Sequence, residues 1–164
     1  MSLNKKISLC LVFVLSLIFM TSCTKQALSD VELKNLENNI KSINISAPGP
    51  NIRAWIPKDL NVTSSYILSM LKQAKQYDDK LPANNASQTR KSNIGSSQLH
   101  LVASDGHIIT IRPYHYYDED GNKQYIANVL TFSKDDTLSI SCIMSNDLYD
   151  WLKNGKWQTE FTIY

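Results

Sequence analysis

Three histidines, His100, His107 and His115, fall in one short stretch of the chain. Imidazole is a common acid–base group and a common zinc ligand, so this stretch is the first place to look for chemistry. The dipeptide Asp105-Gly106 predicts a tight hairpin turn, because its glycine supplies the positive φ that such turns need. This hairpin would hold His100 and His107 about 13 Å apart. We therefore expect solvated histidines, no shared metal site and no cofactor.

Two further groups could carry chemistry. The acidic run 118–122 suggests a calcium loop, but an EF-hand needs a Glu at its twelfth position, where this chain has Val129. We expect a solvated acidic turn. Cys142 lies in an apolar stretch with no identified histidine or positive charge beside it, which favours a buried structural thiol over a reactive one.

Residues 112–117 combine aromatic and cationic side chains. Aromatic residues with one polar end are common at interfaces, although packing in the core or on a sheet is the ordinary alternative. We expect a binding surface formed by Arg112, Tyr114, His115, Tyr116 and Tyr117. The chain contains no Gly-rich phosphate loop, Gly-x-Ser-x-Gly, His-Glu-x-x-His or CxxC motif. No catalytic constellation is therefore predicted.

The N-terminus has the features of a targeting signal. Lys5 and Lys6 precede an apolar stretch over Ile7 to Met20, whose 14 residues are too few to span a membrane, which takes about 20. Such a stretch is typical of a signal peptide. The run Met20-Thr21-Ser22-Cys23 that closes it resembles the lipobox of bacterial lipoproteins, with Met20 in place of the usual aliphatic residue.

This resemblance implies cleavage before Cys23 and a diacylglyceryl group on Cys23, so that the mature protein is extracytoplasmic and lipid-anchored. The membrane would be the plasma membrane or an outer membrane. An ordinary secretory signal and an uncleaved anchor are the alternatives. Two or more acyl chains make a durable tether, whereas one holds only marginally. Residues 1–22 would be the signal, 23–41 the anchor and tether, and 42–164 a single domain.

The charge of the chain bears on whether its partner is a nucleic acid. The formal net charge of +2 comes from Lys5 and Lys6, and the 142 residues after the signal carry 15 basic and 15 acidic side chains. A nucleic-acid partner is therefore not expected, because it would need clustered positive charge. Cys142 has no cysteine partner within the mature chain if Cys23 is lipidated. Stability must then come from the hydrophobic core.

The elements that position these residues follow from periodicity and turn residues. The segment 24–39 is either a short helix, started by a capping box at Ser29 and Glu32, or a frayed tether. Helices are predicted over 63–80 and 147–153, and a long polar loop over 83–97. Strands are predicted over 42–47, 52–56, 98–103, 108–112, 124–132, 137–144 and 157–164.

The order of these elements predicts an α+β fold, with an antiparallel sheet of about five strands, mainly a meander, and one long and one short helix on one side. The expected function is a non-enzymatic binding or accessory module at the cell envelope, with a protein or envelope component as partner. The alternatives are an inhibitor or immunity protein against an envelope-acting toxin or hydrolase, and a small enzyme that uses His107, His115 or Cys142.

Overall fold

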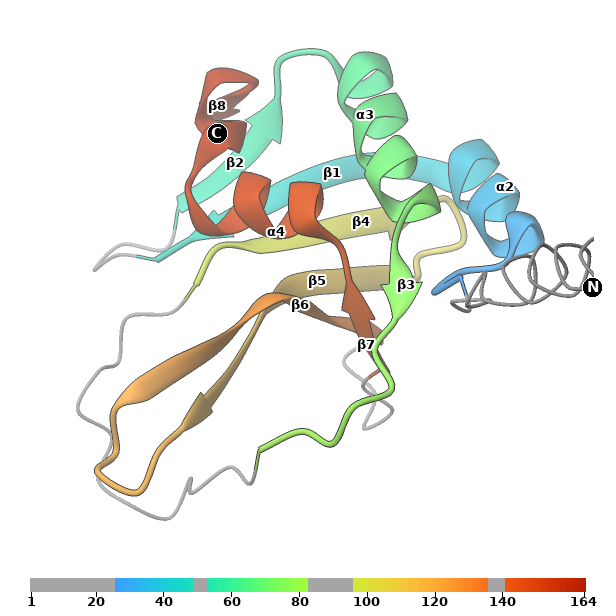
Figure 1. The fold of residues 1–164 in the computed structure, drawn as a ribbon. Helices are drawn as coiled ribbons and strands as arrows, with labels where there is room; N and C mark the ends of the chain where they lie inside the picture. The colour runs from blue at the N-terminus through green and yellow to red at the C-terminus, as the bar shows by residue number, and fades with distance from the viewer. Residues whose placement is uncertain (1–25, 49–52, 83–95, 136–140) are drawn as a thin grey trace, which may run out of the picture.

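In the described part of the chain, an antiparallel sheet is joined to three α-helices (Figure 1). A computed structural model describes residues 26–48, 53–82, 96–135 and 141–164. Within them the helices are α2 (Asp30–Asn39), α3 (Leu60–Lys72) and α4 (Asn146–Lys153). The strands are β1 (Ile40–Ala47), β2 (Arg53–Pro57), β3 (Lys75–Gln76), β4 (Gln98–Ala103), β5 (Ile108–Tyr117), β6 (Lys123–Lys134), β7 (Ser141–Met144) and β8 (Phe161–Ile163).

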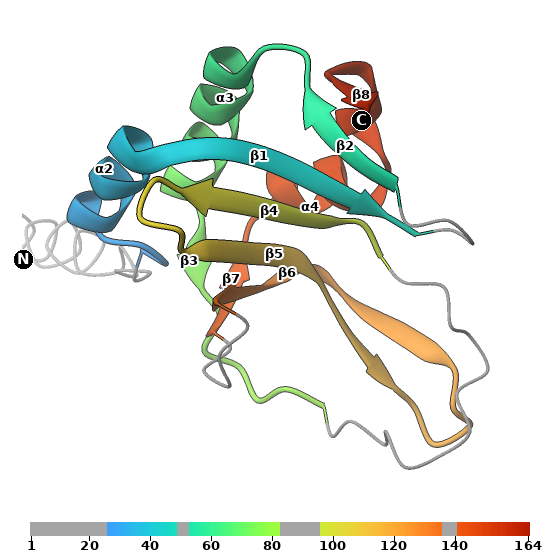
Figure 2. The same cartoon turned by 180° about the vertical axis from the view of Figure 1, so that it is seen from behind.

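The sheet is covered on one face. Its eight strands run in the order β3-β7-β6-β5-β4-β1-β2-β8, and α3 and α4 lie on one side of it. The view from behind shows β1, β4 and β5 with no described helix in front of them (Figure 2). The α+β class and the antiparallel sheet are confirmed. None of the described helices is long and apolar enough to cross a membrane.

The core lies between the sheet and the helices. Because side chains alternate along a strand, one face collects Ile45, Leu99, Ile111 and Leu130, each fully buried. Ile45, Leu99 and Ile111 form a row of direct cross-strand partners, and Leu130 on β6 lies beside this row, opposite Pro113. The helices cover this row with buried apolar side chains, namely Ile67, Met70, Leu71, Leu148, Trp151 and Leu152. Each such side chain contributes about 1.5–3 kcal/mol through burial.

Helix α2 belongs to the domain. Its capping box is present, since the Ser29 backbone N–H donates to Glu32 at 2.8 Å and Glu32 N–H donates to the Ser29 hydroxyl. The Ser29 hydroxyl also donates to the Glu32 carboxylate at 2.7 Å, and this bond, followed by the one from the Ser29 backbone N–H, lowers the Glu32 pKa. Leu28 and Leu33 are only 6% and 8% exposed within the core. The short-helix alternative therefore holds for this segment, and the described chain is packed from residue 26 onward.

The prediction of about five strands is wrong, because the described residues form eight. Strand β3 was missed because its two residues are too few for an alternating pattern. The predicted helix 63–80 ends at Lys72, after which Lys75 and Gln76 pair with β7. The predicted strand 157–164 is divided into a 3-10 helix, Lys156–Thr159, and β8. Of the predicted loop 83–97 and strand 137–144, residues 83–95 and 137–140 lie outside the described residues.

The β4–β5 register also differs from the sequence prediction. A two-residue turn would pair His100 with Ile111, but His100 lies opposite Thr110. The reason is a longer turn, in which Gly106 N–H donates to Ala103 and Ala103 N–H donates to His107. Gly106 has φ +89°, as a three-residue loop with a glycine bulge requires.

An irregularity interrupts the β5–β6 ladder in the middle of the hairpin. Pro113 lies opposite Leu130, but two residues later His115 lies opposite Tyr125. Proline has no N–H to donate, and Asn128 takes a positive φ of 65° on the bulging strand. The carbonyl of Asn128 accepts from Ser145 N–H, which begins α4. The bulge therefore connects the hairpin to the helix that covers the core.

Candidate binding surface

The structure divides the predicted binding residues between two faces. Arg112 pairs with Thr131 on the side of the sheet away from the helices, and Tyr114 and Tyr116 follow it at alternate positions of β5. His115 and Tyr117 alternate with them and lie on the side of α4. We call the side on which no described helix lies the open face, and its residues include Asn44, Ser46, His100, Thr110, Arg112, Tyr114 and Tyr116.

The centre of the open face is a hydrogen-bonded chain built on His100. Its Nε2 lies 3.1 Å from the Ser46 hydroxyl and its Nδ1 lies 3.1 Å from the Thr110 hydroxyl. A neutral imidazole has one donor and one acceptor nitrogen, and here each has a hydroxyl partner. The ring is therefore held in one orientation at the centre of the face. Ser46 and Thr110 were missed from sequence, because their meeting depends on the pairing of three strands.

Tyrosines gather where the open face crosses from β5 towards β7. Burial raises the pKa of Tyr114, and the neighbouring Cys142, Tyr77 and Tyr116 raise it further. Tyr77 N–H donates to the Cys142 carbonyl at 3.0 Å. Cys142 is 9% exposed, and burial raises its pKa too, so the thiol stays protonated at neutral pH. This part of the face offers phenol rings and no reactive thiolate.

His115 and Tyr117 belong instead to an aromatic cluster beneath α4. The His115 ring centre is 5.9 Å from Tyr117 and 6.0 Å from Tyr125. Lys153, in the last turn of α4, places its ammonium 3.6 Å from the centre of the Tyr125 ring. Tyr117 is only 6% exposed. These residues attach the β5–β6 hairpin to the helix layer, which is a structural role.

Removing the Lys153 ammonium is expected to loosen this attachment. Lys153 is exposed, and a cation–π contact at an exposed site contributes about 0.5–1 kcal/mol, so Lys153→Gln should lower the free energy of unfolding by that amount. Hydrogen exchange of amides 114–117 and 123–126 should accelerate more than that of the core strand β4. Lys34→Gln, on the exposed surface of α2, is the control. Equal exchange rates in wild type and Lys153→Gln would contradict the structural role.

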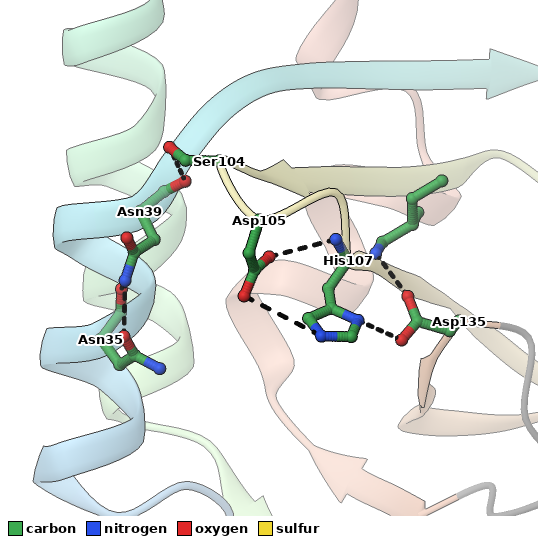
Figure 3. Close-up of polar contacts among 7 residues, drawn as sticks. Asn35, Asn39, Ser104, Asp105, His107 and Asp135 are labelled. Carbon is green, nitrogen blue, oxygen red and sulfur yellow. Dashed lines mark hydrogen bonds and ion pairs between the residues drawn. The ribbon is translucent and has the colours of Figure 1, made fainter.

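His107 lies apart from both clusters, at the β4–β5 turn (Figure 3). Its Nδ1 is 2.5 Å from Asp135, and its Nε2 is 3.9 Å from Asp105. Asp135 also accepts the Ile108 N–H at 2.7 Å. That backbone hydrogen bond is the main cause of the lowered Asp135 pKa, and His107 adds to it. Here His107 joins the turn to the end of β6, and it is not on the open face.

The described residues contain no group of three or more His, Cys, Asp or Glu side chains that could hold a metal ion. Within the turn 118–122, the Asp118 carboxylate accepts hydrogen bonds from the backbone N–H groups of Asp120 and Asn122. It also accepts from Gln124 Nε2 at 2.9 Å, and that bond is the largest cause of its lowered pKa. This carboxylate therefore organises its own turn.

Two hollows of the described surface lie on the helix side. One is a groove between α2 and α3 of about 450 Å³, where Leu33 and Leu68 are flanked by Lys34 and Lys72. The other, of about 370 Å³, lies at the start of α3 against Glu160. Neither is lined by residues of the open face.

Comparison with known proteins identifies no relative: no protein-family model, curated protein or solved structure matches the chain.

Proposed function

We propose that this chain is a cell-envelope lipoprotein, lipidated on Cys23, whose domain is a non-enzymatic binding module. The observation that supports a binding role is the open face. It combines a cation and two tyrosines of β5, Arg112, Tyr114 and Tyr116, with the hydroxyl–imidazole chain of β1, β4 and β5. Tyrosine and arginine are the residues most enriched in protein interfaces, so a protein partner fits this surface best.

A capture experiment tests the binding role. Immobilised residues 24–164 should retain a specific protein from detergent-solubilised envelope. Tyr114→Ala should weaken this capture by about tenfold or more, since buried aromatic anchors contribute about 2 kcal/mol or more to an interface. Tyr164→Ala is the matched control, because Tyr164 is 91% exposed and joins the fold through its backbone N–H to Ala54.

The result also separates the alternatives. Loss of capture in Tyr164→Ala together with full capture in Tyr114→Ala would refute the open face as the binding surface. A captured toxin or hydrolase that loses its activity on binding would identify the chain as an inhibitor or immunity protein.

One observation favours a small enzyme, on residues other than the predicted His107, His115 and Cys142. The Ser46 hydroxyl is within hydrogen-bond distance of the His100 ring, whose other nitrogen is held by Thr110. A base that is oriented by a third group can activate a serine nucleophile. A fluorophosphonate probe reacts with serines activated in this way. Labelling of Ser46 that disappears in His100→Ala would support a hydrolase, whereas an unlabelled Ser46 favours the binding module.

A further inference from the structure

The first described residue, Gln26, is held firmly by the fold. Its side chain donates to the Lys72 carbonyl at 3.2 Å, and its backbone pairs with Lys75 in an antiparallel bridge. The next residue, Ala27, donates its N–H to Ala74 at 3.0 Å. Leu28 then enters the core with 6% of its surface exposed. The chain is therefore attached to the end of α3 and to the β3 edge from Gln26 onward.

The lipid attachment site is close to this fixed point. Cys23 precedes Gln26 by three residues. Three residues span at most about 10 Å even when fully extended. A lipidated Cys23 lies at the membrane surface. Gln26 would therefore lie within about 10 Å of that surface. A spacer of this length is too short for the folded domain to rotate freely relative to the membrane.

We infer that the lipid holds the domain upright on its β3 edge, a conclusion that rests on the proposed lipidation of Cys23. Strand β3 is one edge strand of the sheet and β8 is the other. Figure 1 shows the start of α2 and β3 on one side of the molecule, with β2, β8 and the C-terminus on the other. The β3 edge then faces the bilayer and the β8 edge points away from it.

The side chains at the β3 edge suit a membrane surface. Lys72 and Lys75, the two residues that Gln26 contacts, are both exposed. Ammonium groups beside a lipid anchor are attracted by anionic headgroups. The nearby carboxylate of Glu32 is occupied by its hydrogen bonds with Ser29, while Asp30 remains exposed. The partner of this edge is therefore the headgroup layer of the bilayer that holds the lipid.

The orientation bears directly on the proposed binding role. A sheet that stands on one edge strand has both faces roughly perpendicular to the bilayer. The open face, with Arg112, Tyr114 and Tyr116, then stays accessible from the side. A partner bound there would lie next to the domain, above the same membrane.

The test uses the full chain, produced in a bacterial host that processes lipoproteins and reconstituted in vesicles of phosphatidylcholine and phosphatidylglycerol. A fluorophore is attached at Lys75→Cys on β3 or at Thr162→Cys on β8, both exposed positions. A nitroxide on the lipid headgroup quenches nearby fluorophores. The expected result is quenching several-fold stronger at position 75 than at position 162. Protein without an added cysteine shows whether the buried Cys142 takes up label.

A longer spacer is the matched control. Ten Gly and Ser residues inserted between Thr24 and Lys25 add a flexible span of about 17 Å. Quenching at positions 75 and 162 should then become similar. Equal quenching before the insertion, in protein that sediments with the vesicles, would overturn the orientation and leave the lipid anchor intact. Protein that does not sediment and carries no lipid would refute the anchor, and the orientation with it.

Discussion

Replacing Trp157 by alanine is expected to lower the free energy of unfolding by about 3–5 kcal/mol. Trp157 is 1% exposed and stacks edge-on against Trp55 at 5.2 Å and Phe161 at 5.9 Å. Strand β8 contributes Phe161, and β2 contributes Trp55. Removal of the indole would leave a cavity between the 3-10 helix and these two strands. Domains are stable by only about 5–15 kcal/mol, so the effect is a large share of the total.

The same tryptophans provide a matched comparison. The Trp157 indole N–H is buried with no hydrogen-bond partner among the described residues, whereas the Trp151 indole N–H donates to Glu160 at 3.2 Å. An unpaired buried N–H carries a desolvation cost that phenylalanine would remove. Trp157→Phe should therefore destabilise the domain less than Trp151→Phe, by about 1 kcal/mol or more, because only the latter loses a hydrogen bond to a carboxylate.

Urea denaturation of residues 24–164, followed by tryptophan fluorescence and circular dichroism, would measure these differences. The comparison needs coincident transitions by both probes, which is the test of two-state unfolding. A loss below about 1 kcal/mol in Trp157→Ala would show that the 3-10 helix does not contribute to the cooperative core. A larger loss in Trp157→Phe than in Trp151→Phe would show that the Trp157 N–H has a partner.

The sequence was most informative where many residues share one period. The apolar stripe of α3, the capping residue Ser145 of α4 and the strand 98–103 all follow local rules, and each is present. The edge strand β3 was not predicted, because two residues carry no period and their pairing depends on partners far along the chain, whereas β8 is the end of the strand predicted over 157–164. The number of strands in the sheet therefore depends on tertiary contacts, which the local sequence pattern does not encode.

The candidate surface was predicted only in part. Arg112, Tyr114 and Tyr116 share a face, as strand alternation requires, and alternation likewise separates His115 and Tyr117 from them. The prediction of one surface from all five residues did not take into account that successive side chains of a strand point to opposite faces. The position of His100 between Ser46 and Thr110 could not be predicted, because the β4–β5 register depends on one bulge residue in the turn. A shift of one residue changes every cross-strand partner.

The second large effect concerns Cys23. In Cys23→Ala, incorporation of labelled fatty acid is expected to be lost completely, because the thiol is the only group in the proposal that carries the diacylglyceryl lipid. The variant should also become extractable from membranes by alkaline carbonate. Its remaining attachment would be the apolar stretch Ile7 to Met20, whose 14 residues span about 21 Å as a helix. The hydrocarbon core is about 30 Å thick, so this stretch is shorter than a membrane span and should hold the variant weakly.

The matched control is Cys142→Ala, which removes the buried thiol of β7 and leaves the proposed lipobox sequence unchanged. It should keep both the fatty-acid label and resistance to carbonate. Two or more acyl chains hold a protein stably, whereas a short apolar stretch does not, so the two variants should differ almost completely in their membrane fraction. Equal labelling of wild type and Cys23→Ala would exclude Cys23 as the lipid site. Resistance of Cys23→Ala to carbonate would instead favour an uncleaved anchor, and the upright orientation on the β3 edge would then lose its premise.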